Sequence, residues 1–415
     1  PMPVPITTTL SATCLLSRKT IAIYIACVQQ NGQMIEGQAK STAYRRDRPQ
    51  GWRVRLLGWR NRVIGSQRFQ KWAAATPFVR SIARRRAVQL FGLVAGFSYS
   101  QVLLAFVESG CVQRLAQGPA TTPELAEIAG LSGDACVRLM RAASALGIAQ
   151  EVGPKGKAAC WMLGRHGAAL HGNAGALAMI RHHRLLYADL ADPLALLRAD
   201  RADSTELSRF WTYAGRGGDA VVGGSADAYS NLMSASQAAV SHEILAAYNF
   251  ARHDSLLDVG GGHGAFLTAV AEAAPRLSLG LFDLPEVVES APESLGADRH
   301  PGSFLTDELP RGYDCISLVR ILHDHDDEPA MWILRNIRAA LAPGKTLLIG
   351  EPLAETSGAE AMGGGYFGMY LWAMGSGRPR TAKEIRAMLA EAGFSASRRI
   401  STRQPLIASL IVARA

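Results

Sequence analysis

The spacing of apolar residues changes near residue 250, and this change divides the chain. Residues 51 to about 245 have mostly helical spacing, whereas short apolar runs alternate with helical patterns from there on. The expected strands are apolar runs bounded by turn formers: Leu256–Val259, Leu277–Phe282, Cys315–Leu322, Thr346–Ile349 and Leu406–Val412. A helix is expected from Glu328 to Leu341. Strands that alternate with helices predict an α/β fold with a doubly wound, mostly parallel sheet.

The helical part contains a segment, residues 122–141, that resembles a helix-turn-helix. We expect Thr122 to cap the first helix, Gly130 to end it and Ser132 to cap the second. Residues 153–161 are expected to form the small hairpin wing of a winged helix. The sequence therefore predicts a mostly helical, winged-helix domain over residues 51–245, followed by the α/β domain over residues 246–415.

Positive charge is concentrated near the amino terminus. The net charge is +9 over 415 residues, but between Arg45 and Arg86 thirteen basic residues stand against the single acid Asp47, so the remainder carries about −3. Apolar and aromatic residues such as Trp52 and Trp59 interleave with the arginines, a mixture that suits an anionic membrane surface or a partner helix. The alternative, which we favour from sequence, is an exposed helix pair whose apolar stripe packs on the body of the protein.

Composition bounds the remaining possibilities. Hydrophobic residues make up 48% and charged residues 19% of the chain, which excludes bulk disorder, collagen and coiled coil. Residues 1–50 lack periodicity and are expected to be a weakly ordered basic extension; a signal peptide there is an alternative, but Arg18 and Lys19 split its apolar runs. We find no apolar stretch near the ~18 residues of a membrane-spanning helix. The six cysteines are scattered without CxxC spacing, so a reducing cytoplasm fits best.

The segment with most chemical information is Leu256–Leu267, which contains the run Gly-Gly-Gly-His-Gly after an expected strand. Glycines at such a turn let the backbone approach a ligand closely. Asp283 ends the next strand, where an acid can accept both hydroxyls of an adenosine ribose. Gly260, Gly262 and Ala265 also satisfy the dinucleotide pattern, so this turn alone leaves NAD and S-adenosylmethionine both open.

Further segments decide between these two cofactors. They follow the glycine turn in a fixed order: 302–304, 313–328, 344–353, 377–381 and 392–394. In order and spacing they resemble the class I S-adenosylmethionine-dependent O-methyltransferases, in the branch that includes caffeate and acetylserotonin enzymes. The resemblance implies S-adenosylmethionine as the cofactor and a winged-helix domain that makes a homodimer.

Four longer segments carry a narrower resemblance. Residues 62–72, 96–101, 185–193 and 366–377 are similar to the carotenoid hydroxyl O-methyltransferases of purple photosynthetic bacteria, of the demethylspheroidene and hydroxyneurosporene type. This resemblance implies methylation of the tertiary hydroxyl of an acyclic hydroxycarotenoid. It also implies a cytoplasmic enzyme with peripheral contact to the inner, photosynthetic membrane. The stretch from Tyr366 to Met374 can line an apolar tunnel for such a chain, or simply be core.

The resemblance also implies roles for individual residues. His323, just past an expected strand, aligns with the catalytic base, and Glu351 with the glutamate that orients it. The family's second such acid falls at Pro379 and is absent. Cofactor contacts carried over by position are Gly260, Asp283, Ser303, Phe304, Arg320 and Met233; Tyr229 is the substrate contact. Ser303 departs from the commoner acid at its position.

Two other interpretations concern the same residues. The run from His323 to Glu328 contains possible metal ligands, but acids directly before a helix complement its positive end, so we expect capping and no metal. His325 is expected to point away from His323 on an extended chain and receives no catalytic role.

Rival functions remain open from sequence. One keeps the chemistry but methylates a phenol, polyketide or tetrapyrrole. Another is a DNA-binding regulator, which requires a basic recognition helix. Residues 133–142 offer only Arg138 and Arg141, so we expect no nucleic-acid partner.

Overall fold

The computed structural model describes residues 51–153, 159–200, 204–210 and 225–415, with the side chains of 225–235 excepted. The chain divides into two compact units, Pro1–Leu93 and Val94–Ala415, and the division falls within one long helix. The expected amino-terminal extension, residues 1–50, lies outside the described residues.

The described part of the first unit is helical. It contains α2 (Trp52–Gly65), α3 (Gln67–Ala75) and the beginning of α4 (Pro77–Glu108). Ser66 separates the first two helices because its Oγ accepts a hydrogen bond from the backbone N–H of Phe69 and so caps α3. Helix α2 buries no residue at all. Most of its apolar side chains, among them Trp52 and Trp59, are exposed, and the packing of an apolar stripe on the body of the protein stays a prediction.

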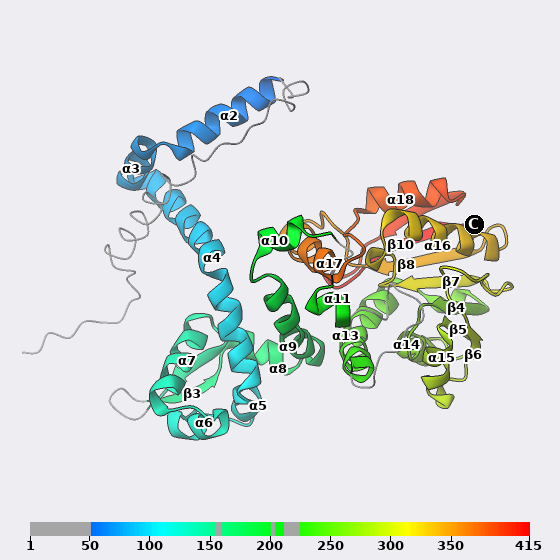
Figure 1. Ribbon diagram of the computed structural model, residues 1–415, viewed down its shortest axis with the longest axis horizontal. Coiled ribbons are helices and arrows are strands. Elements are labelled where there is room, and N and C mark those ends of the chain that lie inside the picture. The colour runs from blue at the N-terminus through cyan, green and yellow to red at the C-terminus, as the bar shows by residue number, and fades with distance from the viewer. Residues whose placement is uncertain (1–50, 154–158, 201–203, 211–224) are drawn as a thin grey trace, which may run out of the picture. The chain divides into compact units, whose positions relative to one another are not determined.

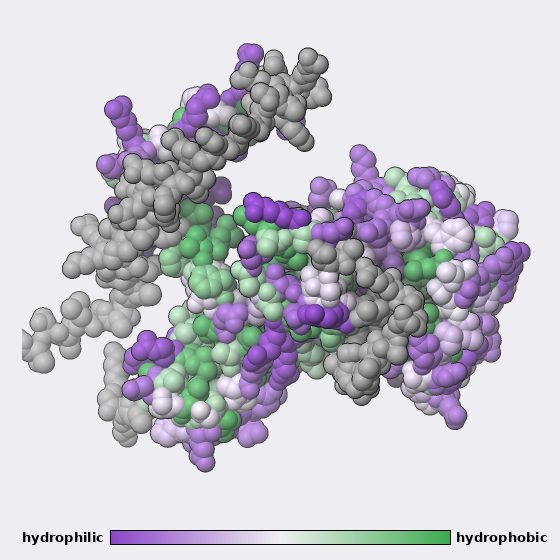
Figure 2. Space-filling model, viewed as in Figure 1, coloured by the Kyte–Doolittle hydropathy of each residue, from purple (hydrophilic) through white to green (hydrophobic). Residues whose placement is uncertain are grey.

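Helix α4 corrects an expectation about membrane-spanning length. Its residues from Ala87 to Val107 carry no charge, and an 18-residue window has a mean hydropathy of 1.8 with 17% of it buried. By length and composition α4 is long and apolar enough to cross a membrane, although one such helix is weak evidence for crossing. The polar residues Ser98 to Gln101 interrupt the apolar run and hid it from a search for continuous hydrophobicity. Figure 2 shows apolar side chains at the surface along the middle of α4.

The second unit begins with a winged-helix module. Helices α6 (Thr122–Ala129) and α7 (Gly133–Ala145) pack beside a three-stranded sheet in the order β1-β3-β2. Gly130 ends α6 in the left-handed conformation and Ser132 caps α7, as expected. Thr121, not Thr122, caps α6, because the Thr122 hydroxyl accepts a hydrogen bond from the buried Trp161 indole at 3.0 Å.

The wing also differs from its expected place. Its strands are β2 (Ala149–Val152) and β3 (Cys160–Leu163), paired antiparallel. The expected segment 153–161 therefore mostly connects these strands, and residues 154–158 within it lie outside the described residues. The third strand, β1 (Ala120–Thr121), pairs with β3.

The rest of the second unit is built on a seven-stranded sheet, shown in Figure 1, with the order β6-β5-β4-β7-β8-β10-β9. The strands are β4 (Ser255–Val259), β5 (Ser278–Asp283), β6 (Asp298–Pro301), β7 (Cys315–Val319), β8 (Thr346–Glu351), β9 (Ala396–Ile400) and β10 (Ser409–Arg414). Strands β4 to β8 run parallel, with Leu257 opposite both Gly280 and Ile316, and β10 is antiparallel to both neighbours. The doubly wound α/β fold expected from the sequence is confirmed.

Helices cover both faces of this sheet (Figure 1). Helices α16 (Asp327–Ala340) and α18 (Ala382–Glu391) pack on one face, and α13 (Ser225–Ala247) and α14 (Ala265–Ala273) on the other. Neighbouring residues of one strand pack on opposite faces of the sheet: Leu256 lies in the core beneath α13 and α14, and Leu257 lies in the core beneath α16 and α18. Burial on both faces explains why the central strands have continuous apolar runs.

Other helices complete the unit. They are α5 (Cys111–Ala116), α8 (Arg165–His171), α9 (Ala174–Asp189), α10 (Pro193–Arg198), α11 (Glu206–Phe210), α15 (Pro285–Ser290), α17 (Gly368–Met374) and a π-helix, η4 (Ala361–Phe367). Short 3₁₀ turns are η1 (Phe250–Arg252), η2 (Glu293–Leu295) and η3 (Leu322–Asp324).

Strands β1, β6 and β9 were not predicted, and some strand ends differ from the prediction; β10, for example, begins at Ser409 rather than at Leu406. Strands β6 and β9 are rich in charged residues and lie at the edges of the sheet, so they lack an apolar signal. Strand β7 ends at Val319 rather than at Leu322, because the chain turns into η3. Because parallel strands end at one edge, the carboxyl ends of β4, β5, β7 and β8 meet there, at the position where such sheets bind ligands.

Candidate active site

A glycine turn joins β4 to α14 at this edge. Gly260, Gly262 and Gly264 have φ of 70°, 58° and 79°, in the left-handed region that favours glycine. A Cβ at Gly260 would lie 2.6 Å from Ile321 Cδ1, whereas a Cβ at Gly262 would meet no atom within 4 Å. Protein atoms therefore fill the space beside Gly260, whereas the space beside Gly262 is open, so a ligand can approach the backbone there.

Asp283 lies beside this turn at the end of β5. Its Oδ2 accepts a hydrogen bond from the Gly262 N–H at 2.8 Å, and its Oδ1 accepts one from the Leu284 N–H at 2.8 Å. Burial raises the pKa of the Asp283 carboxyl, and the two N–H groups counter that rise in part. A carboxylate has about four lone-pair positions, so positions remain for the hydroxyls of a sugar.

The aromatic ring of Phe304 lies beside the glycine turn, near Gly260. Phe304 Cε1 would lie 3.3 Å from a Cβ at Gly260, and the Phe304 ring meets the His325 ring edge to face with centroids 5.5 Å apart. Ser303 uses its polar atoms locally, because its Oγ accepts from the Leu305 N–H. The structure thus brings Phe304 to the glycine turn, while the cofactor contact of Ser303 stays a prediction.

His323 lies in η3, the turn that follows β7. It is buried, with its Nε2 3.1 Å from Asp324 Oδ1 and its Nδ1 3.6 Å from Glu351 Oε1. The same Glu351 oxygen accepts the backbone N–H of His323 at 3.1 Å. The Nδ1 atom has no hydrogen-bond partner among the described residues, because 3.6 Å is too long for one. The structure therefore brings His323 and Glu351 together, as the resemblance implied.

The charges around His323 outweigh its burial. Burial alone lowers the pKa of the imidazole, but the carboxylates of Asp324 and Glu351 raise it to about 10. The pKa of Asp324 is lowered, since its interaction with His323, helped by His325 and Arg320, outweighs the effect of its own burial. His323 thus lies in a negatively charged environment that favours its protonated form when nothing else is bound.

His325 does not follow the extended-chain expectation, because the backbone turns between Leu322 and Asp324. Its ring is buried against Phe304. The acids after it also do more than complement a helix. The side chain of Asp326 makes no capping bond; its Oδ1 accepts the Gly377 N–H instead, at 3.0 Å.

Arg320 stands between β7 and this turn with a φ of 59°, a conformation that a residue with a side chain adopts at a cost. Its backbone N–H donates to the Gly350 carbonyl at 2.9 Å, and its Nη1 donates to Ser236 Oγ at 2.7 Å. These contacts hold the guanidinium at the edge of the sheet that also holds His323. Met233 and Tyr229, one and two turns before Ser236 on α13, have side chains outside the described residues.

Sequence analysis singled out Tyr366 but missed His183, which lies beside it. The π-helix η4 carries Tyr366 and Phe367, and such helices are frequent at functional sites. The Tyr366 hydroxyl lies 2.8 Å from His183 Nε2, and the Phe367 ring lies 6.3 Å from the His323 ring. Further along, Tyr370 and Met374 are buried core. Of the stretch from Tyr366 to Met374, Phe367 thus lies beside the ring of His323.

Comparisons with known proteins identify the family. Residues 187–395 match the O-methyltransferase domain family. The chain is 40% identical to demethylspheroidene O-methyltransferase of Rhodobacter capsulatus, over 85% of this chain and 88% of that protein. The corresponding enzyme of Cereibacter sphaeroides is 39% identical over 85% and 93%. This chain belongs to the O-methyltransferase family.

A solved structure supports the same assignment of fold and cofactor. The methyltransferase CalO1 of calicheamicin biosynthesis, in its SAH-bound form, is 27% identical, covers 80% of this chain and 98% of its own, and has a TM-score of 0.66. The O-methyltransferase uses S-adenosylmethionine, which decides against the NAD alternative left open by the glycine pattern.

The residues of this O-methyltransferase fit that cofactor. The backbone is open at Gly262, the Asp283 carboxylate has acceptor positions to spare, and the Phe304 ring offers a face for a purine. When bound, S-adenosylmethionine supplies an electrophilic methyl group on a sulfonium. The chain must supply a place for the acceptor oxygen and a group that takes its proton.

Proposed function

We propose that the enzyme methylates the tertiary hydroxyl of an acyclic hydroxycarotenoid, as in carotenoid biosynthesis. The observation that carries this proposal is the 40% identity to demethylspheroidene O-methyltransferase over most of both chains. Tyr366 packs against a buried, largely apolar cluster that includes Leu186, Leu207 and Leu371, and such surroundings are compatible with a hydrocarbon acceptor.

The experiment is a panel of acceptors with methyl-labelled S-adenosylmethionine. Demethylspheroidene and a hydroxyneurosporene are offered in detergent micelles beside a phenol, a polyketide and a tetrapyrrole. Label in the carotenoid, as a methoxy group, is the expected result. Efficient labelling of a phenol or a tetrapyrrole with none in the carotenoids would replace the substrate but keep the reaction.

In this proposal His323 is the general base and Glu351 orients it. A tertiary alcohol is much less acidic than a phenol, whose pKa is near 10. Proton removal therefore accompanies or follows methyl attack, and the positioning of the oxygen contributes more to the rate. A positive charge brought next to His323 lowers its pKa, so the imidazole becomes a free base only in the loaded site.

The remaining site residues are proposed in the roles that their positions suggest. Gly260, Asp283, Phe304, Arg320, Ser303 and Met233 contact the cofactor, and Tyr229 contacts the acceptor. His323→Ala should lose at least about 10²-fold in kcat, as expected for a general base, while it still binds S-adenosylhomocysteine in calorimetry. Near-normal turnover in that variant, with binding retained, would show that another group takes the proton.

We further propose that the enzyme is a homodimer formed through its helical, winged-helix part, with the domain boundaries at residues 50/51 and 245/246. Exposed apolar side chains on α4, among them Leu93 and Phe97, offer surface for a second copy. Light scattering on the purified enzyme is the direct test. A monomer at all concentrations would remove this part of the proposal.

The proposal also includes peripheral contact of a cytoplasmic enzyme with an anionic membrane. Its support is the composition of α2 and α3, where Trp52, Trp59 and Trp72 are exposed among arginines and no acidic residue occurs. Aromatic side chains at the headgroup level and arginines near anionic lipid are the usual components of such contact.

Flotation with vesicles tests this contact. The double variant Arg53→Glu and Arg60→Glu should lose binding to vesicles that contain phosphatidylglycerol. Arg398→Glu, a charge reversal on an exposed residue of β9, should not change binding. Equal flotation of the two variants, or flotation with neutral vesicles alone, would count against an electrostatic membrane contact by α2.

A further inference from the structure

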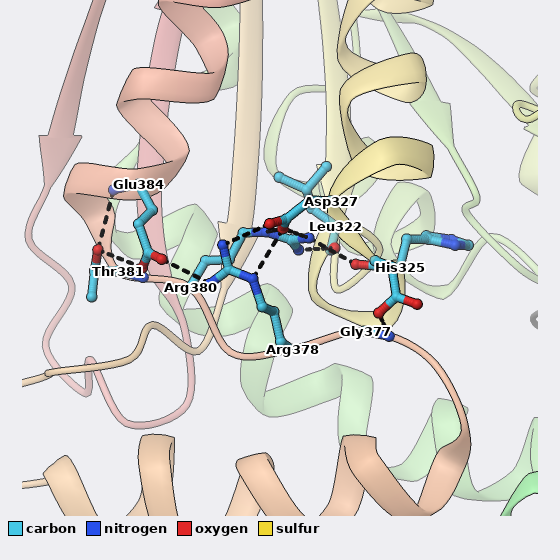
Figure 3. Close-up of polar contacts among 9 residues, drawn as sticks. Leu322, His325, Asp327, Gly377, Arg378, Arg380, Thr381 and Glu384 are labelled. Atoms are coloured by element: carbon cyan, nitrogen blue, oxygen red, sulfur yellow. Dashed lines mark hydrogen bonds and ion pairs between the residues drawn. The ribbon is translucent and has the colours of Figure 1, made fainter. Parts of the chain in front are cut away.

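One loop holds the backbone of the turn that carries His323. The turn from Leu322 to His325 has four carbonyl oxygens, and all four accept hydrogen bonds from residues 376–380. The bonds are Arg380 Nη1 to Leu322 at 2.6 Å, the Arg378 N–H to His323 at 2.9 Å, Ser376 Oγ to Asp324 at 2.7 Å and Arg380 Nη2 to His325 at 2.8 Å. Figure 3 shows Arg380 between the first and last of these carbonyls.

Arg380 is the centre of this arrangement. Its side chain is fully buried, and its charge is met by Asp327, whose Oδ1 lies 2.7 Å from Nη2. A buried arginine is stable only when its donors are paired, and here one rigid, planar group reaches two carbonyls and a carboxylate. Its own carbonyl accepts the Ala354 N–H at 2.9 Å, which ties the loop to the segment after β8.

The loop approaches the turn so closely that only glycine fits at one position. Gly377 has a φ of 82°, and a Cβ there would lie 2.2 Å from the His323 carbonyl oxygen. Its N–H donates to Asp326 Oδ1 at 3.0 Å. The loop and the turn are thus in direct backbone contact at Gly377 and Arg378.

The neighbouring Arg378 shows what is special about Arg380. The Arg378 side chain binds the carboxylates of Asp327 and Glu384 rather than the carbonyls of the turn (Figure 3). It is also more exposed than Arg380, whose side chain is fully buried. Two arginines of one loop therefore share an acid, but of these two side chains only that of Arg380 reaches the turn of His323.

Building on the role proposed above for His323, we propose that Arg380 is a positioning residue for it. By fixing the carbonyls of Leu322 and His325, Arg380 keeps the imidazole between the carboxylates of Asp324 and Glu351. This contribution matters here because Glu351 Oε1 lies 3.6 Å from Nδ1, too far for a hydrogen bond, so among the described residues Asp324 Oδ1, 3.1 Å from Nε2, is the side-chain contact that orients the ring. Small displacements of a catalytic group are costly in rate.

The test compares Arg380→Lys with Arg378→Lys as its matched control. A lysine ammonium keeps the charge beside Asp327 but has no planar fork with which to reach both carbonyls. We expect Arg380→Lys to lower kcat by about tenfold or more, with little change in the KM of either substrate. The pKa of His323, followed by NMR of ¹⁵N-histidine, should fall as the ring moves away from its carboxylates. Arg378→Lys should change neither quantity.

A second variant covers the case in which Arg380→Lys does not fold. Ser376→Ala removes one of the four bonds to the turn and leaves the buried charge in place, so kcat and the pKa of His323 should move in the same direction by a smaller amount. Binding of S-adenosylhomocysteine reports folding in each variant.

The outcomes distinguish a failure of the positioning role of Arg380 from a failure of the base role of His323. The positioning role would be overturned if Arg380→Lys folds and has the same kcat and His323 pKa as Arg378→Lys. If Arg380→Lys does not fold, a Ser376→Ala variant with wild-type kcat and His323 pKa would overturn it. Full turnover of His323→Ala would instead overturn the base assignment, whatever Arg380 does to the position of the ring.

Discussion

The charge balance around His323 allows a quantitative prediction. Asp324 and Glu351 both raise the pKa of the imidazole, and Asp324 contributes more. Asp324→Asn and Glu351→Gln each remove one of these charges at nearly constant volume. Both variants should therefore lower the pKa of His323, and Asp324→Asn should lower it further.

The size of the effect follows from the rise of the His323 pKa from 6.5 to about 10. One pKa unit corresponds to about 1.4 kcal/mol, so the folded enzyme favours the protonated form by about 5 kcal/mol relative to the unfolded chain. Removing one carboxylate at this distance should lower the pKa by about 1–3 units.

The same rise predicts how stability depends on pH. The folded pKa lies above the unfolded one, so this contribution is fully present below pH 6.5 and is lost as the pH rises toward 10. In Asp324→Asn the contribution should be smaller, and its loss should be complete at a lower pH than in the wild type.

Two assays check these expectations. NMR of ¹⁵N-histidine follows the His323 resonance through its titration in the donor-free enzyme, and urea unfolding at several pH values gives the free energy of unfolding. A wild-type His323 that titrates at or below 6.5 would refute the reasoning. A larger decrease in Glu351→Gln than in Asp324→Asn would refute the assigned order of the two charges.

Two further predictions concern Gly262 in the cofactor turn and Asp258 in the preceding strand, β4. Gly262→Ala should cost about 1–2 kcal/mol of stability because φ is positive there. It should also weaken S-adenosylhomocysteine binding in calorimetry by about tenfold or more. The control is Gly296→Ala, which has a similar φ and equally open surroundings and should cost as much stability but leave the affinity unchanged. Equal affinities would mean that no ligand approaches Gly262. Burial raises the pKa of Asp258 to about 7, so its charge destabilises the fold increasingly as the pH rises from 3.8 to 7, by about 4 kcal/mol in all. Asp258→Asn, which can still accept the Ser317 hydroxyl, should lose this slope in urea unfolding, and an unchanged slope would contradict the assignment.

The sequence determined the local parts of this protein. Continuous apolar runs marked the strands that are buried on both faces, and the glycine run marked the turn that a side chain would block at Gly260. The order of motifs also indicated the family and the pair His323 and Glu351. Patterns of this kind are readable because each residue's neighbours along the chain set its backbone conformation and its burial.

Prediction from the pattern of apolar residues failed in some segments, and each failure has a physical reason. Strands β6 and β9 lie at the ends of the sheet and need no apolar face, so their sequences resemble loops. Polar uncharged residues concealed the length of the apolar part of α4. The 3₁₀ turn at His323 changed the direction of His325, because an argument from strand periodicity ends where the strand ends.

Only the tertiary structure decided how distant groups meet at the site. It buried Arg380, a residue type that sequence alone would place in water, between two carbonyls of a turn more than fifty residues earlier. It paired His183 with Tyr366, and it set the 3.6 Å between His323 and Glu351. These contacts join segments that share no local pattern, so they exist only once the strands and helices that carry them have packed together.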